Sequence, residues 1–240
     1  GLGDTMSLPA TIQIETRQYP KAVCTGFGRV FYGAQGRVYF SPVITDNFEA
    51  LGRCYQQNDP TAEDLTDVLA TDGGEIPIPE LGALYHIEAF KTGIIVFGEN
   101  GIWFIRGTSD TGFTALSYIV DKISDLRLHS KRSVSFVEDS LVFCTSSGLY
   151  RAELAQNFSV AIVPMTELRI DSYMHSFITE NTVSSYDKEA RKLYISDSGM
   201  LGKILVYDVR LDAFYPWKVT IPGLSSATGV EGVTYDTHQR

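Results

Sequence analysis

The chain has 240 residues, of which 44% are hydrophobic and 20% are charged, and its formal net charge is −9. This composition is that of a folded globular domain and excludes a disordered or collagen-like chain. The net negative charge argues against nonspecific nucleic-acid binding, because that affinity comes from Lys and Arg side chains that neutralise phosphates. The charge is unevenly distributed: the stretch from Asp46 to Glu80 holds nine acids and one base, which account for −8 of the −9.

Other global features exclude further classes of protein. No apolar run approaches the roughly 18 residues that a membrane-spanning helix needs. The N-terminus has neither a basic start nor an apolar core, so it does not read as a signal peptide, and it lacks an initial Met, from which we expect a piece of a longer polypeptide. The three cysteines, Cys24, Cys54 and Cys144, are far apart and odd in number, which favours buried free thiols over a disulfide or a metal site.

The predicted elements begin with a β-hairpin. Residues 29–32 form an apolar strand, residues 33–36 a tight turn, and residues 37–40 a second strand rich in aromatic side chains.

An acidic insertion follows this hairpin and is expected to span residues 46–81. Within it, Thr61 is a suitable N-cap, and Glu63 and Asp64 in the first turn suit the positive end of a helix dipole. We therefore expect one short helix, over residues 61–70, in a segment larger than a normal connection between strands.

The hairpin pattern then returns three times along the chain. The later copies span 94–105, 141–151 and 192–208, and a further strand is expected before each of them, at 85–90, 133–137 and 183–186. The tail segment 229–236 repeats the pattern of 183–187, ending like it on Tyr-Asp.

The spacing of the hairpins predicts the fold class. Equivalent strands begin near residues 37, 94, 141 and 192, so the repeat length is 57, 47 and 51 residues. Repeats of about 40 to 50 residues with four short strands are typical of β-propeller blades. We therefore predict an all-β fold in which residues 1–240 form part of an incomplete β-propeller of about four to five blades, with one short helix in the inserted segment. The blade-like repeats are expected near residues 9–45, 82–120, 129–168 and 181–219, with the start of another at 225–240. A stack of sandwich sheets is the alternative architecture.

The sequence offers no catalytic constellation, and we expect no enzyme activity, no cofactor and no metal. There is no G-x-S-x-G nucleophile motif, and the four histidines lack the spacing of zinc ligands. The acidic insertion lacks the D-x-[DN]-x-[DN]-G spacing of a calcium loop. Residues 108–114 resemble one aspartate box of sialidase-type propellers, but Ala115 replaces the aromatic residue that follows and the motif occurs once. We interpret this segment as a polar hairpin turn.

Several segments together resemble the tail tubular protein B, or nozzle, family of short-tailed bacteriophages. The most specific is the run Cys54-Tyr55-Gln56-Gln57-Asn58-Asp59-Pro60-Thr61. The resemblance continues at residues 37–42, 46–48, 70–74, 96–103, 112–113, 185–187, 207–209 and 214–217, and so spans most of residues 29–217.

The resemblance implies a structural rather than a catalytic role. It implies a subunit of a homo-oligomeric ring, a hexamer, around the DNA ejection channel at the distal end of the tail, in the virion and assembled in the host bacterial cytoplasm. The implied partners are other tail proteins, the tail adaptor and the tail fibres, while DNA passes without specific binding.

The acidic insertion then has two alternative orientations. Its acids Asp59, Glu63, Asp64, Asp67 and Asp72 are candidates for a surface that faces either the lumen or a neighbouring subunit. Facing the lumen, they would repel DNA phosphates and keep the DNA moving. The alternative function is a carbohydrate-binding or glycan-hydrolysing propeller that recognises a host surface, and a third hypothesis is a generic protein-interaction propeller.

Overall fold

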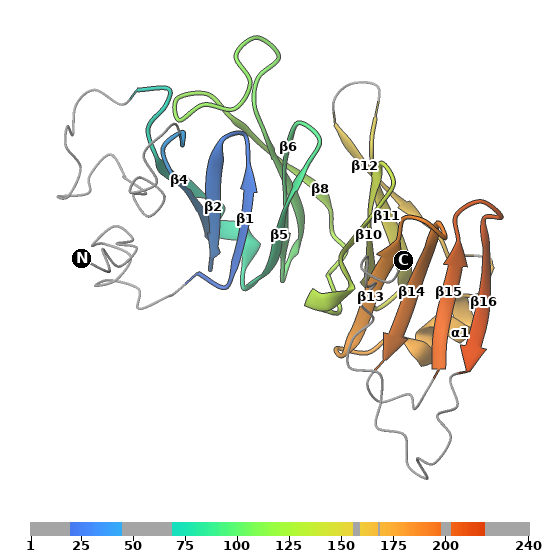
Figure 1. Cartoon of the computed structure of the whole chain (residues 1–240). Coiled ribbons are helices and arrows are strands. Elements are labelled where there is room, and N and C mark those ends of the chain that lie inside the picture. The colour runs from blue at the N-terminus through green and yellow to red at the C-terminus, as the bar shows by residue number, and fades with distance from the viewer. Residues whose placement is uncertain (1–19, 45–68, 156–158, 168, 198–202, 219–240) are drawn as a thin grey trace, which may run out of the picture. The chain divides into compact units, whose positions relative to one another are not determined.

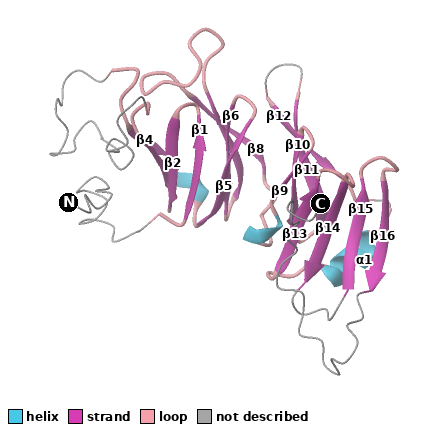
Figure 2. Ribbon diagram, viewed as in Figure 1, coloured by secondary structure: helices cyan, strands magenta, loops and turns pink. Residues whose placement is uncertain are grey.

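The computed structural model describes residues 20–44, 69–155, 159–167, 169–197 and 203–218 (Figure 1). These residues fold as sixteen β-strands, two short 3-10 helices and one α-helix (Figure 2). The strands are β1 Ala22–Gly26, β2 Arg29–Ala34, β3 Arg37–Phe40, β4 Gly74–Pro77, β5 Leu84–Phe90, β6 Gly93–Gly98, β7 Gly101–Arg106, β8 Ile119–Ser124, β9 Ser135–Val137, β10 Ser140–Thr145, β11 Gly148–Leu154, β12 Val160–Pro164, β13 Thr182–Asp187, β14 Lys192–Asp197, β15 Lys203–Asp208 and β16 Ala213–Lys218. The helices are η3 Pro79–Leu81, η4 Lys131–Ser133 and α1 Asp171–Phe177.

The strands form four sheets of four antiparallel strands each, which confirms the predicted all-β class. Every sheet is a meander whose strands pair in chain order: β1–β4, β5–β8, β9–β12 and β13–β16. The four predicted hairpins form the two central strands of these sheets, with the register Tyr32↔Tyr39 in the first and Val96↔Trp103 in the second.

Three of the four sheets begin with a two-residue turn whose first residue is not glycine and has a positive φ, namely Phe27 (53°), Lys91 (52°) and Glu138 (54°). The fourth sheet differs, because four residues join β13 to β14 and the positive φ belongs to the last of them, Arg191 (54°). A positive φ is uncommon for residues other than glycine, so its recurrence in the first turn is a feature that these three sheets share. This repetition supports the repeat pattern seen in the sequence.

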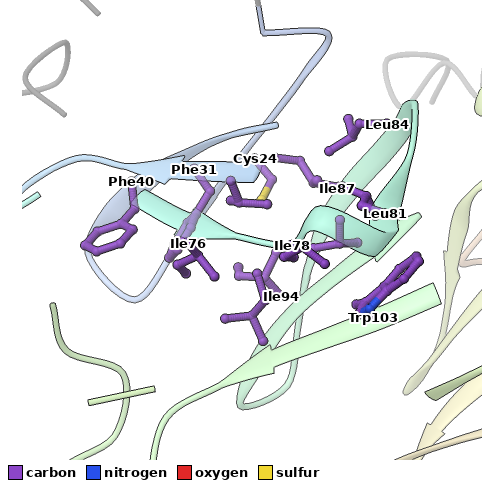
Figure 3. Packing of buried hydrophobic residues seen from close by; sticks show 13 residues of the cluster. Cys24, Phe31, Phe40, Ile76, Ile78, Leu81, Leu84, Ile87, Ile94 and Trp103 are labelled. Atoms are coloured by element: carbon purple, nitrogen blue, oxygen red, sulfur yellow. The ribbon is translucent and has the colours of Figure 1, made fainter. Parts of the chain in front are cut away.

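The chain divides into two compact units, Gly1–Arg127 and Leu128–Arg240. In the first unit, sheets β1–β4 and β5–β8 share one apolar core, in which Phe31, Phe40 and Ile76 of the first sheet lie with Ile94 and Trp103 of the second (Figure 3). Strands β2 and β6 are buried along their whole length, which explains why β6 is apolar throughout and why only apolar or aromatic residues follow Arg29 in β2.

In the second unit, sheets β9–β12 and β13–β16 share a separate core with α1. Met174 and Phe177 of α1 are buried beside Cys144 of β10 and Leu193 of β14. Their spacing of three residues places both side chains on one face of this short helix, which contacts β11.

The structure contains an α-helix that the sequence analysis did not predict. The helix expected at 61–70 lies outside the described residues, apart from Leu69 and Ala70, which are not helical. The α-helix of the described chain is α1, at Asp171–Phe177, in the connection from β12 to β13. It was missed because it spans seven residues, begins without a side-chain cap at Ile170 and carries only two apolar anchors.

The end of the acidic insertion is also corrected. Within the segment 46–81, residues 74–77 form β4, the fourth strand of the first sheet, which pairs with β3. Ile76 is fully buried in the core, and Val38 of β3 lies opposite to it. The insertion is therefore the connection between two neighbouring strands of one sheet, and does not separate two sheets.

Candidate functional site: the base of the acidic insertion

The connection from β3 to β4, which contains the insertion, leaves the first sheet at Ser41, and both ends of this connection are described, at residues 41–44 and 69–73. Ser41 hydrogen-bonds through its backbone N–H to the carbonyl oxygen of Val30 at 2.9 Å, and its hydroxyl accepts from the Val30 N–H at 3.0 Å. The two ends meet directly, because the N–H of Val43 donates to the carbonyl oxygen of Thr71 at 2.8 Å. The insertion thus closes at its base into a loop anchored on β2.

Arg29, the first residue of β2, lies at the centre of this base. Its side chain is buried, with the residue 2% exposed. Nη1 donates to the carbonyl oxygens of Ser41 at 2.7 Å and Asp72 at 2.5 Å, and Nη2 donates to that of Ala70 at 2.7 Å. One guanidinium therefore satisfies the buried carbonyl oxygen of Ser41 before the insertion and the part-buried carbonyl oxygens of Ala70 and Asp72 at its far end.

Aromatic rings surround the guanidinium. The carbon Cζ of Arg29 lies 5.4 Å from the centroid of the Phe40 ring and 5.8 Å from that of Phe113, within the range of cation–π attraction. The rings of Phe40 and Phe113 contact each other edge to face at 5.2 Å. The positive charge of the Arg29 guanidinium is therefore stabilised by backbone carbonyl dipoles and by the π-faces of two aromatic rings.

The electrostatics of Arg29 follow from this environment. Burial lowers the pKa of the guanidinium, and the negative charge of Asp72 opposes this effect. Among the described residues, no carboxylate lies within ion-pair distance of Arg29, and its Nε has no hydrogen-bond partner. A guanidinium keeps its proton under such conditions, so the base of the insertion carries a buried positive charge.

Asp72 is the one candidate surface acid that the structure describes. Its Oδ2 accepts from the backbone N–H of Leu69 at 2.7 Å, so the side chain closes the turn that leads out of the insertion. The other candidates, Asp59, Glu63, Asp64 and Asp67, lie outside the described residues. For Asp72 the structure therefore gives a local turn-closing role beside Arg29.

The segment that resembles an aspartate box adjoins this base. The N–H of Ala115 donates to the carbonyl oxygen of Ala70 at 3.2 Å, which links the segment to the exit of the insertion. Thr108 and Gly112 pair as an isolated β-bridge, and Gly112 has a φ of +68°. The segment is a tight polar turn, as expected, with Asp110 exposed and the Phe113 ring packed against Phe31 and Tyr118.

Gly107 and Gly112 explain how this turn stays compact. A Cβ at Gly107 would lie 1.9 Å from the carbonyl carbon of Gly112, so any other residue at this position forces the backbone apart. The turn therefore positions Phe113 beneath Arg29 through a close approach of two glycines.

Nothing in the described part of the chain adds catalytic chemistry to this base. No group of three or more His, Cys, Asp or Glu side chains that could hold a metal ion occurs among the described residues. Cys24 and Cys144 are buried free thiols, as expected, and burial raises the pKa of each to about 12, which makes them poor nucleophiles. Cys54 lies outside the described residues.

Sequence reasoning missed Arg29 itself. The available signal was a single charged residue at the start of a strand whose other residues are apolar or aromatic, next to Gly28. Arg is seldom fully buried without partners, so a lone Arg in a buried strand indicates a set of acceptors brought from elsewhere in the sequence.

Comparison with known proteins gives little further information. No family model matches the chain, and no curated protein matches it. Among solved structures, it is similar to the extracellular domain of BT4673, a protein assigned to a one component system of B. thetaiotaomicron, with a TM-score of 0.44 and 12% sequence identity. That match covers 89% of this chain and 23% of the other. No helix in the described part of the chain has the length and apolar character needed to cross a membrane.

Proposed function

We propose that this chain is a structural subunit of a bacteriophage tail nozzle, that it forms part of a ring around the DNA ejection channel, and that it has no catalytic role. The observation that carries the proposal is the run from Cys54 to Thr61, which resembles the tail tubular protein B family. This run belongs to the insertion whose base Arg29 closes, so the most family-like residues are attached to a scaffold of paired strands.

We further propose that the scaffold is part of a β-propeller. Each sheet is a four-stranded meander in chain order, which is the strand order of a propeller blade. Within each unit the first strands of the two sheets contact each other, β1 with β5 and β9 with β13, as expected for strands nearest to a central channel.

A ring of such subunits gives the acidic insertion a mechanical role. If it faces the lumen, its nine acids outweigh its single base and repel the phosphates of passing DNA. If it faces a neighbouring subunit, it contributes to the ring interface. The proposed partners are a second copy of the chain in a hexameric ring, the tail adaptor and the tail fibres, in the distal tail of the virion.

The mass of the assembly tests the proposal. Native mass spectrometry of the purified protein should show one discrete closed oligomer, the hexamer expected from the resemblance. A protein that stays monomeric over the whole accessible concentration range contradicts the ring.

DNA ejection separates the two orientations of the insertion. In virions, the triple substitution Glu63→Gln, Asp64→Asn and Asp67→Asn should slow ejection or retain DNA if the insertion faces the lumen. The matched control removes three exposed acids of the described chain, Asp110→Asn, Glu167→Gln and Glu180→Gln, and should eject normally. Normal ejection by the insertion variant rules out the lumenal orientation, and a ring that falls apart in this variant supports the interface.

The aspartate-box-like turn at residues 108–114 favours a second candidate, a carbohydrate-binding or glycan-hydrolysing propeller that recognises a host surface. A glycan array and a hydrolase assay on the purified protein test this candidate. A signal that Asp110→Ala abolishes supports it, and the absence of any signal removes it.

A further inference from the structure

The tip of the β6–β7 hairpin consists of Glu99 and Asn100, and Gly101 follows at the one place in the sequence where glycine comes directly after asparagine. Because glycine has no side chain, its backbone nitrogen is unhindered and can attack the amide of the asparagine before it. In this reaction the nitrogen of Gly101 bonds to Cγ of Asn100, and the Cγ–Nδ2 bond breaks. Nδ2 leaves as ammonia with the proton of the attacking N–H. Water then opens the resulting cyclic imide to an aspartate or an isoaspartate.

The hairpin tip is fastened by hydrogen bonds to the loop of residues 80–83. The N–H of Glu99 donates to the carbonyl oxygen of Ala83 at 2.8 Å, and the N–H of Asn100 donates to that of Leu81 at 3.3 Å. The N–H of Ala83 in turn donates to Oε2 of Glu99 at 3.2 Å. Leu81 is fully buried in the core of the first unit, so the tip is attached to a fixed part of the fold (Figure 3).

Both groups that would react are held in this arrangement. Nδ2 of Asn100 donates to the carbonyl oxygen of Glu80 at 3.0 Å. Gly82 lies against the amide, because a Cβ at that position would be 3.0 Å from Nδ2. Gly101 pairs with Gly98 in the ladder between β6 and β7. Attack of the Gly101 nitrogen on Asn100 therefore requires the tip to leave the loop.

Deamidation changes the chemistry of this contact. The product carboxylate has no N–H, so the carbonyl oxygen of Glu80 loses the donor that Asn100 supplies. The new negative charge also lies close to that of Glu99, because a Cβ on Gly82 would be 3.0 Å from Nδ2 of Asn100 and 3.1 Å from Oε2 of Glu99. Like charges at this separation repel each other, so the modified tip binds the loop less tightly.

We propose that Asn100 is a deamidation site, that docking of the hairpin tip on residues 80–83 protects it, and that the reaction weakens this docking afterwards. A brief opening of the tip then becomes a lasting one, because hydrolysis of the imide does not restore the amide. The inference concerns contacts within the first unit and does not depend on the proposed nozzle function.

Peptide mass spectrometry of the full chain tests the protection, after incubation at pH 8 with and without guanidinium chloride. Deamidation of Asn100 should be at least about tenfold slower in the folded protein, because only the fraction with an open tip reacts. Asn181 is the internal control, since it is also exposed but precedes the β-branched Thr182 and should react slowly in both samples. Equal rates at Asn100 in the two samples, or no reaction in the unfolded sample, overturn the proposal.

A variant at the tip separates local opening from global unfolding. Glu99→Ala removes the acceptor of the Ala83 N–H, so it should raise the rate of Asn100 deamidation severalfold in the folded protein and leave the rate in guanidinium chloride unchanged. The matched control Asp110→Ala removes an exposed acid in another turn of the same unit and should change neither rate. A folded Glu99→Ala protein that reacts like the unsubstituted one contradicts protection by the tip.

Hydrogen exchange measures the consequence of the reaction. Asn100→Asp reproduces the aspartate product and should speed exchange of the Glu99 amide, whose N–H donates to Ala83. Added salt should reverse part of this increase, because it screens the repulsion between the two carboxylates. Asn100→Ala also lacks the donor but adds no charge, so its increase should be smaller and independent of salt. If exchange in Asn100→Asp equals that of the unsubstituted protein, the modified tip still docks and the proposal is wrong.

Discussion

The guanidinium of Arg29 donates a buried hydrogen bond of 2.7 Å to the carbonyl oxygen of Ser41, and so joins the first residue of β2 to the first residue after β3. The same side chain reaches Asp72 and Ala70 at the other end of the insertion. Both ends of the connection are fixed to one residue of the sheet. The entropy cost of closing this loop therefore depends on its length, and little on which residues it contains. Sequence changes inside residues 45–68 should therefore leave the sheet intact.

The first prediction concerns this buried contact. Arg29→Met keeps much of the apolar stem but removes the donor of the buried bond to Ser41 and of the part-buried bonds to Ala70 and Asp72, so we expect a loss of about 2–4 kcal/mol in the free energy of unfolding. Arg29→Lys keeps the charge but lacks the planar fork, and should lose less. Urea unfolding followed by circular dichroism measures both changes. An Arg29→Met protein with an unchanged midpoint would show that the carbonyl groups find other partners.

A second prediction follows from Asp212, whose carboxylate accepts hydrogen bonds from Arg169 at 2.7 Å and from the Tyr207 hydroxyl at 2.8 Å. The bond from Arg169 and then that from Tyr207 lower the pKa of Asp212 from 3.8 to about 2. Since the folded pKa is depressed, the ionised carboxylate stabilises the fold above pH ~4, and this contribution disappears as the pH falls through about 2.

Asp212→Asn should therefore lower the melting temperature at pH 7 and have little effect near pH 2. The side chain is 57% exposed, so solvent screening keeps the loss below about 1 kcal/mol. Thermal unfolding between pH 2 and pH 7 measures this difference, with the exposed Asp110→Asn as the control. If Asp212→Asn destabilises the protein equally at pH 2 and at pH 7, ionisation of Asp212 is not the source of the stability that the variant loses.

The strands could be predicted from sequence because they carry a local signal. Runs such as Ile94–Phe97 and Leu141–Cys144 are apolar, β-branched and bounded by turn residues, and they form the buried central strands β6 and β10. Where the turn is short, as between β2 and β3 or between β6 and β7, it also predicts that the two strands pair as neighbours.

The elements that the sequence did not reveal depend on contacts between distant residues. Strand β4 has four residues, of which one is proline and one, Ile76, is buried, so only its pairing with β3 identifies it. The role of Arg29 requires Ser41 and Asp72 to converge on it, and they are separated from it by 12 and 43 residues. Local patterns contain no information on such convergence.

A third prediction uses the turn between β5 and β6. Lys91 adopts a φ of 52°, in the left-handed region where a side chain costs free energy and glycine does not. Lys91→Gly should stabilise the protein by about 0.5–1 kcal/mol, since the relief of strain exceeds the entropy cost of glycine in the unfolded chain. Lys91→Ala removes the same long side chain but keeps the Cβ, so it should not stabilise. Urea midpoints of the two variants measure the difference, and equal midpoints would exclude backbone strain at this turn.

A fourth prediction concerns the cysteines. Cys24 and Cys144 are buried, and burial raises the pKa of each thiol to about 12, so at pH 8 only about one thiol in 10⁴ is ionised. In a Cys54→Ser variant, the folded protein should react with Ellman's reagent far more slowly than a free thiol, and two thiols should react at once in 6 M guanidinium. Because reaction then requires opening of the core, its rate in the folded protein should rise with added urea in parallel with the unfolded fraction. Fast reaction of either thiol without denaturant would contradict the burial of Cys24 in the first core or of Cys144 in the second. The single variants Cys24→Ser and Cys144→Ser identify the thiol that reacts.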